Sequence, residues 1–234
     1  MSRAVVVTRP AGQGDPLAAR LVDAGHRAWA VPALAIEPLP LADAHRRLLF
    51  DLDLYHAVFF VSANAAHHAL NAFADLWPQW PVGVHWLAVG ESTAAVIRDA
   101  GLTPEYPRSG FNSEAVLALP CLASVAEKRI LICRGDSGRD WLAARLREKG
   151  AGVDVVPFYR RPPAPGRHWP EGADTVMITS VEGWRAMAAL VPAEATVIAA
   201  GERVAAAVAE QHPGPLVVAA SAHDSDMLAA VPLS

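Results

Sequence analysis

The sequence is poor in cysteine, in charged residues and in aromatic residues. Only two of its 234 residues are cysteines, Cys121 and Cys133, too few for a disulfide framework and more typical of buried free thiols. Charged residues make up 19% and aromatic residues 7%, against 53% hydrophobic residues, so alanine, valine and leucine must fill the core. This composition favours helices packed on β-sheets over an all-β sandwich, and the length suits two domains.

Long apolar runs and an excess of positive charge are also missing. No apolar stretch approaches the roughly 18 residues of a membrane span, and the opening MSRAVVVTRP lacks the layout of a signal peptide. Lysine and arginine total 20 against 24 for aspartate and glutamate, which argues against a general nucleic-acid or anionic-membrane surface. We therefore expect a cytoplasmic protein without nucleic-acid or membrane partners, although a local anion site stays open.

Motifs for nucleotides, metals and nucleophilic hydrolysis are weak or missing. The run Gly12-Gln13-Gly14 begins a dinucleotide fingerprint but lacks its third glycine, and the sequence has no Walker loop and no G-x-S-x-G elbow. His67 and His68 are adjacent on a predicted helix and so point to different faces, and neither cysteine has a C-x-x-C partner. We expect no cofactor and no metal, and a nucleotide-dependent α/β enzyme is the least favoured hypothesis.

What the sequence does contain is an internal repeat. Residues 5–32 align without a gap on residues 130–157, so that Arg9 falls on Arg134 and both copies share the letters LAARL. Each copy has the pattern of a buried strand, a helix that ends at a glycine and a second strand, which is a parallel βαβ unit. Strand–turn–helix units then follow in the same order in both halves. The expected fold is α/β, with two lobes that are each a parallel sheet flanked by helices.

Two proline-rich segments interrupt the halves after their βαβ units. They are PALAIEPLPL at residues 32–41 and FYRRPPAPG at residues 158–166. Because proline is kept out of central strands, we interpret residues 32–41 as an extended connector rather than core, and both segments as strand-like connectors that run side by side between the lobes. Lobe one would then hold residues 1–36 and 161–234, and lobe two residues 37–160 with the connectors, leaving a cleft between the lobes.

Five strand-to-helix turns carry small, hydroxylated or charged residues. They are Thr8-Arg9-Pro10, Ser62-Ala63-Asn64, Gly90-Glu91-Ser92-Thr93, Thr179-Ser180-Val181 and Gly201-Glu202-Arg203. Ligands of parallel α/β sheets bind beyond the carboxyl ends of the strands, where helix N-termini present N–H groups to carboxylate or phosphate. The alternative is that serine and threonine merely cap helices, as we also expect of Ser113.

Tyr159 is the candidate for chemistry, because it opens the second connector beside the expected cleft. A phenol is normally a donor at neutral pH and is suited to polarising a leaving hydroxyl. The alternative is that Phe158 and Tyr159 only pack the junction between the lobes.

Several short motifs follow one another along the chain: VVVTRP, LAARLVDAG, FFVSANA, AVGESTAA, FNSEAVL, ILICRGDSGRDWLAARLREKGAGVDVVPFYRR and ITSVEG. Taken in this order, they resemble the uroporphyrinogen-III synthase family over essentially the whole chain. The resemblance implies two α/β lobes joined by a two-stranded connector. It also implies a cofactor-free lyase of tetrapyrrole (haem) biosynthesis, which cyclises the linear tetrapyrrole hydroxymethylbilane to uroporphyrinogen III with loss of water and inversion of ring D.

The resemblance extends to single residues. Tyr159 matches the family's connector tyrosine, a candidate for assisting hydroxide departure; Ser62, Thr93 and Ser180 match hydroxyl positions, and Arg9 matches the opening TRP. The same turns complete the expected substrate-binding set with Ala63, Asn64, Gly90, Ser92, Val181, Gly201 and Arg203. Val204 stands where the family commonly has threonine.

Two expectations about partners accompany these assignments. We expect a monomer that takes hydroxymethylbilane by transient hand-over from the enzyme that makes it.

The second functional hypothesis is a non-catalytic two-lobed module that binds a tetrapyrrole or another anion. The hydroxyl missing at Val204 is the only observation that supports it.

Overall fold

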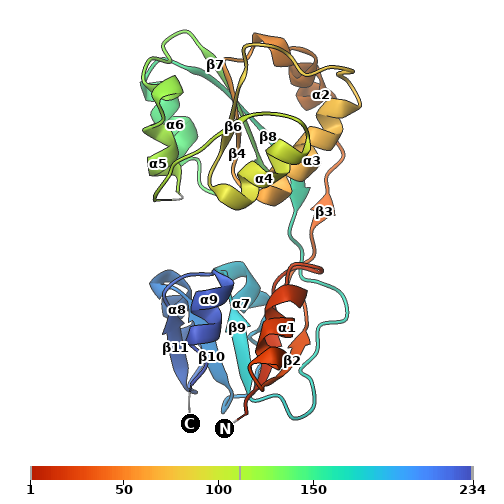
Figure 1. Ribbon diagram of the computed structural model, residues 1–234, viewed down its shortest axis with the longest axis vertical. Coiled ribbons are helices and arrows are strands. Elements are labelled where there is room, and N and C mark those ends of the chain that lie inside the picture. The colour runs from red at the N-terminus through yellow and green to blue at the C-terminus, as the bar shows by residue number, and fades with distance from the viewer. Residues whose placement is uncertain (1, 111, 233–234) are drawn as a thin grey trace. The chain divides into compact units, whose positions relative to one another are not determined.

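Two β-sheets organise the chain, one in each of the units into which it divides (Figure 1). The computed structural model describes residues 2–110 and 112–232. Unit 1 comprises residues 1–36 and 161–234, and unit 2 comprises residues 37–160. The chain therefore passes between the units twice, at Ile36–Glu37 and at Arg160–Arg161, and unit 1 is discontinuous in sequence.

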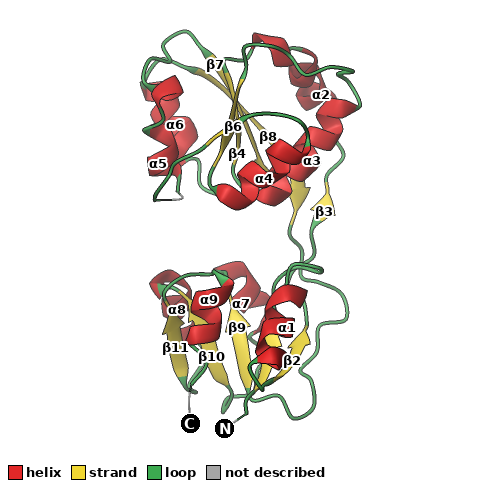
Figure 2. Ribbon diagram, in the orientation of Figure 1, coloured by secondary structure: helices red, strands yellow, loops and turns green. Residues whose placement is uncertain are grey.

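Unit 1 is built on a five-stranded parallel sheet with the strand order β11-β10-β9-β1-β2. Its elements are β1 (Ala4–Val7), α1 (Asp15–Asp23), β2 (Arg27–Ala30), β9 (Thr175–Ile178), α7 (Val181–Met187), β10 (Thr196–Ala200), α8 (Glu202–Ala209), β11 (Leu216–Ala219) and α9 (Asp224–Ala229). Helices cover both faces of the sheet (Figure 2). Val5 packs with Leu17 of α1, whereas Val6 packs with Trp184 of α7, because successive side chains of a strand point to opposite faces.

Unit 2 is built on a six-stranded sheet with the order β3-β8-β7-β4-β5-β6, parallel except for β3. Its strands are β3 (Glu37–Pro38), β4 (Ala57–Phe60), β5 (His85–Ala88), β6 (Pro104–Glu105), β7 (Arg129–Gly135) and β8 (Gly152–Arg160). Its helices are α2 (Asp43–Phe50), α3 (Ala63–Ala74), α4 (Glu91–Asp99), α5 (Ser113–Leu117), α6 (Trp141–Glu148) and the short 3₁₀ turns η1 (Leu52–Leu54) and η2 (Pro120–Leu122). Helices α2, α3 and α4 cover one face of the sheet, and α5, η2 and α6 cover the other.

The internal repeat explains why both sheets share one strand order. Unit 1 combines β1-α1-β2 from the first half of the chain with β9, β10 and β11 from the second. Unit 2 combines β7-α6-β8 from the second half of the chain with β4, β5 and β6 from the first. In each sheet the βαβ pair therefore lies beside three strands of the other half. The prediction of parallel sheets flanked by helices is confirmed.

The two connector segments pair with each other as antiparallel strands. In unit 2, Pro38 is opposite Tyr159, and the Leu39 N–H donates to the Phe158 carbonyl at 2.9 Å. In unit 1, Leu34 and Pro163 form an isolated antiparallel bridge. The edge position of β3 tolerates Pro38, since an edge strand needs no donor on its outer side.

The expectation that residues 32–41 lie outside the core is wrong at the start of the segment. Ala33 is 1% exposed and Leu34 is 6% exposed, and both belong to the core of unit 1. The Ala33 N–H donates to the Thr8 carbonyl at 3.0 Å, so the chain continues alongside the end of β1 before it leaves the unit. The flanking prolines therefore do not keep the intervening small apolar residues out of the core.

Ser113 is not the N-cap of α5. The Asn112 side chain accepts from the Ala115 N–H at 2.9 Å, and Ser113 is the first residue inside the helix. Asparagine at this position does the same capping chemistry as serine. Phe111, which belongs to the FNSEAVL motif, lies outside the described residues.

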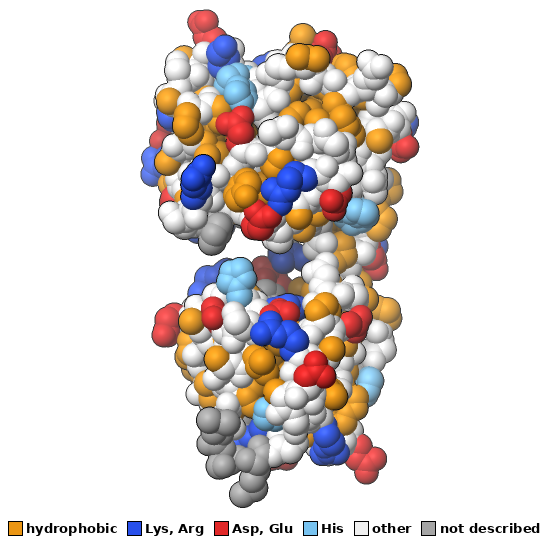
Figure 3. Space-filling view, viewed as in Figure 1, with side chains coloured by type: hydrophobic (Ala, Val, Ile, Leu, Met, Phe, Trp, Pro, Cys, Tyr) orange, Lys and Arg blue, Asp and Glu red, His pale blue; other side chains and the backbone are white. Residues whose placement is uncertain are grey.

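The molecular surface and the helix lengths bear on possible partners. On the face shown in Figure 3, acidic and basic side chains are interspersed over each unit. None of the helices in the described part of the chain combines the length and apolar composition needed to cross a lipid bilayer.

Candidate active site

Tyr159 lies near the end of β8 and contacts a residue 97 positions away in the sequence. Its hydroxyl oxygen is 3.1 Å from Oγ of Ser62, which lies two residues after the end of β4. Strand β7 separates β8 from β4 in the sheet, so the phenol ring has to cross β7 to reach Ser62. Gly135 at the end of β7 permits this, because a Cβ there would lie only 3.1 Å from Cζ of Tyr159.

The hydrogen bonds of Ser62 bear on which proton Tyr159 can offer. Ser62 is the N-cap of α3, and its Oγ accepts from the Ala65 N–H at 3.1 Å. The Ser62 hydroxyl proton is then free to be donated to the phenol oxygen. In that arrangement the Tyr159 O–H proton is left for a third group. The Tyr159 side chain is 5% exposed, so a packing role for the ring holds as well.

His68 completes this cluster, although no sequence pattern places it there. Its ring stacks on that of Tyr159 with centroids 5.7 Å apart and an interplanar angle of 27°. Burial, with a smaller contribution from His67, lowers the pKa of His68 below its usual value, which favours the neutral ring. His68 also borders a hollow in unit 2 between α3 and the connector residues Pro38 to Leu41. The contact depends on the order of the strands, which no local pattern encodes.

The N-terminus of α4 is open, but the threonine within it is buried. Gly90 precedes the helix and offers no side-chain cap, and Ser92 in the first turn is exposed. Thr93 is 1% exposed, and its Oγ1 has no hydrogen-bond partner among the described residues. The hydroxyl expected to face a ligand therefore lies inside unit 2, whereas Glu91 and Ser92 of the first turn are exposed.

Glu91, at the start of the same helix, already has two partners. Its carboxylate accepts from the Tyr106 hydroxyl at 2.5 Å and is paired with Arg98. These two hydrogen bonds, that of Tyr106 above all, lower the pKa of Glu91. An acidic side chain in this turn is thus neutralised by its neighbours rather than directed at an anion.

Arg9 has a structural task in unit 1. Its guanidinium is 2.5 Å from the Asp224 carboxylate and 2.5 Å from the Ala222 carbonyl oxygen. Arg134, which matches Arg9 in the repeat, likewise pairs with Asp140 at 2.5 Å. The arginine of each copy therefore fixes a nearby loop, and Arg9 can assist ligand binding by holding its own turn in place.

Ser180 and Val181 start α7 in the same way as Ser62 and Ala63 start α3. The Ser180 Oγ accepts from the Gly183 N–H at 3.0 Å and so caps the helix. For Ser62 and Ser180 the capping alternative is therefore correct, and Ser62 has its contact with Tyr159 in addition.

The turn before α8 combines an uncapped helix with an exposed cation. Gly201 has a φ of +82°, a conformation that disfavours side chains, and the helix has no side-chain cap. Arg203 in the first turn is exposed and has no ion-pair partner within residues 2–110 and 112–232. Val204 is 2% exposed and matches the buried Thr93 of unit 2 in the repeat. The hydroxyl missing at Val204 is therefore one that would lie in the core.

Within each unit the candidate turns share one edge of the sheet. Strands β1, β9 and β10 are neighbours and parallel, so Arg9, Ser180 and Gly201 follow adjacent carboxyl ends. In unit 2, Ser62 and Gly90 follow the adjacent parallel strands β4 and β5. This is the edge at which parallel α/β sheets bind ligands. The cleft expected between the lobes stays a prediction.

Comparison with known proteins adds an independent observation. A family profile described as "Uroporphyrinogen-III synthase HemD" matches residues 15–229. The uroporphyrinogen-III synthase of Proteus mirabilis is 34% identical over 158 residues, which are 67% of this chain and 79% of that protein. That of Salmonella typhimurium is 34% identical over 166 residues, which are 67% of this chain and 64% of that protein.

Solved structures agree at the level of the fold. A mutant uroporphyrinogen III synthase from Thermus thermophilus has a TM-score of 0.62 at 18% identity, covering 97% of this chain and 96% of that one. The uroporphyrinogen-III synthetase of Helicobacter pylori has a TM-score of 0.61 at 16% identity, covering 97% of each chain. At such identities these structures support the fold and leave the site to be argued from its own residues.

Proposed function

The chain belongs to the uroporphyrinogen-III synthase family, and we propose that it is the enzyme that converts hydroxymethylbilane into uroporphyrinogen III. The observation that carries the proposal is the family match, which runs from residue 15 to residue 229 and so takes in both units. The reaction removes water from a linear tetrapyrrole and closes the ring with ring D inverted. It is a lyase reaction without change of oxidation state, and it requires no cofactor.

The demand on the protein is mainly geometric. Unassisted closure gives the type I isomer, so the protein must hold the chain such that the substituted carbon of ring D attacks and a spirocyclic pyrrolenine forms. Holding reactants in one geometry can contribute about 7–11 kcal/mol in favourable cases. The eight carboxylates of the substrate offer many points at which backbone N–H groups can hold it.

Tyr159 is the proposed catalytic residue, with Ser62 as its positioning partner. The phenol donates its proton to the departing hydroxyl, which leaves as water while the C–O bond of ring A breaks. Ser62 donates to the phenol oxygen at 3.1 Å and stabilises the charge that develops there. His68 holds the ring by stacking and, in its neutral form, adds no competing positive charge.

Substrate carboxylates are proposed to bind at the strand-to-helix turns. The uncapped first turns of α4 and α8 supply N–H groups from Gly90 and Ser92 and from Arg203, with the exposed Arg203 guanidinium as an added cation. Gly201 would act through the conformation of its turn, because its N–H already donates to the Ala199 and Ala219 carbonyls. The remaining members of the proposed set are Arg9, Ser62, Ala63, Asn64, Thr93, Ser180 and Val181. Of these, Arg9 and Thr93 would act through the position of their turns, because their side chains are engaged or buried.

We further propose that the chain acts as a cytoplasmic monomer. Hand-over from the enzyme that makes hydroxymethylbilane would shorten the time in which the free substrate can close to the type I isomer. Sedimentation velocity at micromolar concentration tests whether the chain is a monomer.

Turnover separates an enzyme from a module that only binds tetrapyrroles. The chain is supplied in catalytic amount with a large excess of hydroxymethylbilane, and the oxidised products are separated into isomers. We expect many equivalents of the type III isomer per chain. At most one equivalent, with the rest closing to type I, would instead support the binding module.

A further inference from the structure

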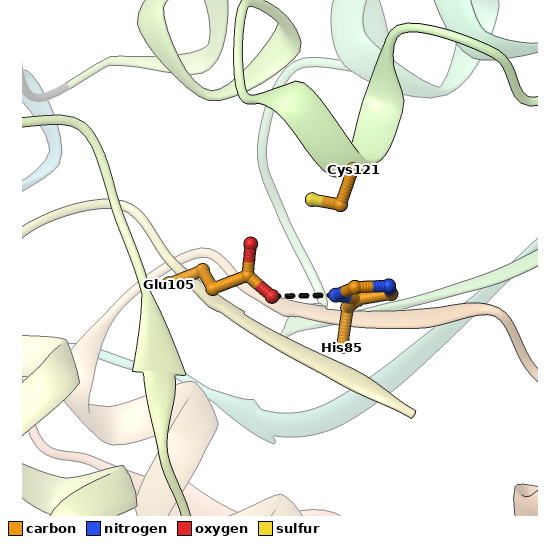
Figure 4. Close-up of side chains that lie close together, drawn as sticks. All are labelled: His85, Glu105 and Cys121. Atoms are coloured by element: carbon orange, nitrogen blue, oxygen red, sulfur yellow. Dashed lines mark hydrogen bonds and ion pairs between the residues drawn. The ribbon is translucent and has the colours of Figure 1, made fainter. Parts of the chain in front are cut away.

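Three side chains of metal-ligating type meet in unit 2, well apart in sequence. Among the described residues, His85, Glu105 and Cys121 are the one group of three whose ligand atoms all lie within 4.8 Å of one another. Figure 4 shows the imidazole and the carboxylate pointing toward each other, with the thiol beside them. The distance between His85 Nδ1 and Glu105 Oε1 is 2.5 Å.

The sheet register places these residues together. Glu105 of β6 is opposite Leu87 of β5, and His85, two residues before Leu87, shares its face of the sheet. The turn η2 covers this face, where Leu122 packs in the same core cluster as Leu87. Cys121, next to Leu122, is thereby brought over the two strands. The sequence separates the three residues by 20 and 16 positions, so no short motif marks them.

The surrounding structure supports His85 and the turn that carries Cys121. His56 Nε2 is 2.8 Å from the Cys121 carbonyl oxygen, and its ring lies edge-on to that of His85 at 4.9 Å. The ammonium of Lys149 donates to the Leu122 carbonyl at 2.9 Å and so fixes the other side of η2. Partners of this kind restrict ligand side chains to a narrow range of positions.

We propose that His85, Glu105 and Cys121 form a binding site for a borderline-soft divalent cation, with Zn²⁺ as the preferred ion. A thiolate, an imidazole and a carboxylate are all ligands of Zn²⁺, whereas Mg²⁺ and Ca²⁺ prefer oxygen ligands alone. This inference does not rest on the proposed function.

The charges of such a site balance. The thiol loses its proton to solvent on binding, so the thiolate and the carboxylate together offset the two charges of the cation, and the imidazole binds as a neutral ligand. A half-buried site tolerates a neutral cluster better than an isolated ion.

The geometry leaves a fourth position open. Bonds of 2.0–2.3 Å to a tetrahedral ion set ligand atoms about 3.3–3.8 Å apart, so the ion would lengthen the contact between His85 and Glu105 and draw the thiol inward. Half-buried side chains can rotate to this extent, since the His85 and Glu105 side chains are 38% and 39% exposed. Glu105 also borders an open hollow lined by Glu91, Tyr106 and Arg108, from which water can reach the ion.

The test uses the untagged full chain, kept reduced and freed of metal. Co²⁺ is the spectroscopic probe, and Zn²⁺ is titrated in competition with it. We expect one Co²⁺ per chain with a thiolate-to-cobalt charge-transfer band, displacement by Zn²⁺, and a rise in melting temperature of several degrees at excess Zn²⁺, because the ion binds only the folded site. The variant Cys121→Ser should lose the charge-transfer band, and His85→Gln and Glu105→Gln should each weaken Zn²⁺ binding at least tenfold.

Matched variants separate this site from background binding. Cys133→Ala removes the other thiol, which is fully buried in β7, and His67→Gln removes a histidine on the exposed side of α3; both should keep the band and the affinity. Circular dichroism establishes that each variant is folded. The proposal is overturned if the unaltered chain gives no charge-transfer band, or if Cys121→Ser and His85→Gln bind Zn²⁺ as the unaltered chain does.

Discussion

Tyr159 shows how one side chain can depend on a glycine that is distant in sequence. Its hydroxyl reaches Ser62 across the strand between them, where Gly135 leaves room for the ring because a Cβ there would lie 3.1 Å from Cζ of Tyr159. Local patterns in the sequence predict both Tyr159 and Ser62 as candidates, but no pattern indicates that they touch. The sequence does not support His68 as a metal ligand, and in the structure its ring stacks on the phenol of Tyr159.

Replacing Tyr159 by phenylalanine tests the proposed proton donor. Positioned acids contribute about 10²–10⁴-fold to rate, so we expect Tyr159→Phe to lose at least about a hundredfold in kcat with the fold intact, as measured by product formation and circular dichroism. Tyr55→Phe is the matched control, because Tyr55 is also buried in unit 2 but donates to Asp154. Equal rates for Tyr159→Phe and the unaltered chain would show that Tyr159 has a packing role and no catalytic one.

The buried hydroxyl of Thr93 leads to a prediction about stability. An unpartnered buried hydroxyl costs about 1–3 kcal/mol, and the repeat places a valine, Val204, at the matching position of unit 1. We expect Thr93→Val to raise the free energy of unfolding by about 1 kcal/mol, measured with urea. A decrease would show that the hydroxyl is satisfied in solution, and a loss of turnover at unchanged stability would give it a role with substrate.

His68 predicts a pH dependence. Its pKa is lowered in the folded chain by burial, so the unfolded chain binds the proton more readily. The stability is then complete above the unfolded pKa of about 6.5 and falls as the pH drops below it. We expect the melting temperature of the unaltered chain to fall more between pH 7.5 and 5.5 than that of His68→Gln. The exposed His168→Gln should follow the unaltered chain, and parallel curves for all three proteins would contradict the prediction.

At the scale of elements, the helix caps divide into two kinds. Ser62 and Ser180 close the N-termini of α3 and α7 with their own side chains, whereas Gly90 and Gly201 leave α4 and α8 open. The closed helices need no ligand at their first turns, and the open ones can accept a carboxylate there. The residue at the N-cap thus decides which helices keep all their first-turn N–H groups for a ligand, and the capped turns before α3 and α7 offer only the remaining ones.

Removing the two serine caps should have equal effects on stability and unequal effects on rate. We expect Ser62→Ala and Ser180→Ala each to lower the free energy of unfolding by about 0.5–2 kcal/mol. Of the two serines, only Ser62 contacts Tyr159, so kcat should fall further in Ser62→Ala than in Ser180→Ala. The variant Ser62→Thr, which keeps a hydroxyl, should recover most of the lost kcat. Chemical denaturation and product formation measure the two quantities. Equal rates in Ser62→Ala and Ser62→Thr would remove Ser62 from the proposed mechanism.

The elements were predictable where the signal was local. Buried strands such as Ala4–Val7, and helices that end before a glycine such as Gly25, follow from apolar runs and backbone constraints. The burial of Ala33 and Thr93 and the meeting of His85 with Cys121 depend on which strands are neighbours. That order comes from packing between distant segments, and no window of sequence contains it.

At the scale of the whole chain, unit 2 is continuous and unit 1 is not. Residues 37–160 contain a six-stranded sheet with helices on both faces and cores of their own. We expect a fragment of these residues to fold alone, with native-like circular dichroism and one cooperative thermal transition. Residues 161–234 lack β1 and α1, which complete unit 1, and should not fold alone. A fragment 37–160 without cooperative unfolding would show that it needs the other unit.

The isomer ratio formed from hydroxymethylbilane tests the central claim most directly. The substrate is incubated with increasing concentrations of the chain, and the oxidised type I and type III products are separated and quantified. If the chain catalyses closure with inversion of ring D, the type III fraction rises with chain concentration until it accounts for nearly all product. Type I alone, formed at the spontaneous rate at every concentration, would contradict the account.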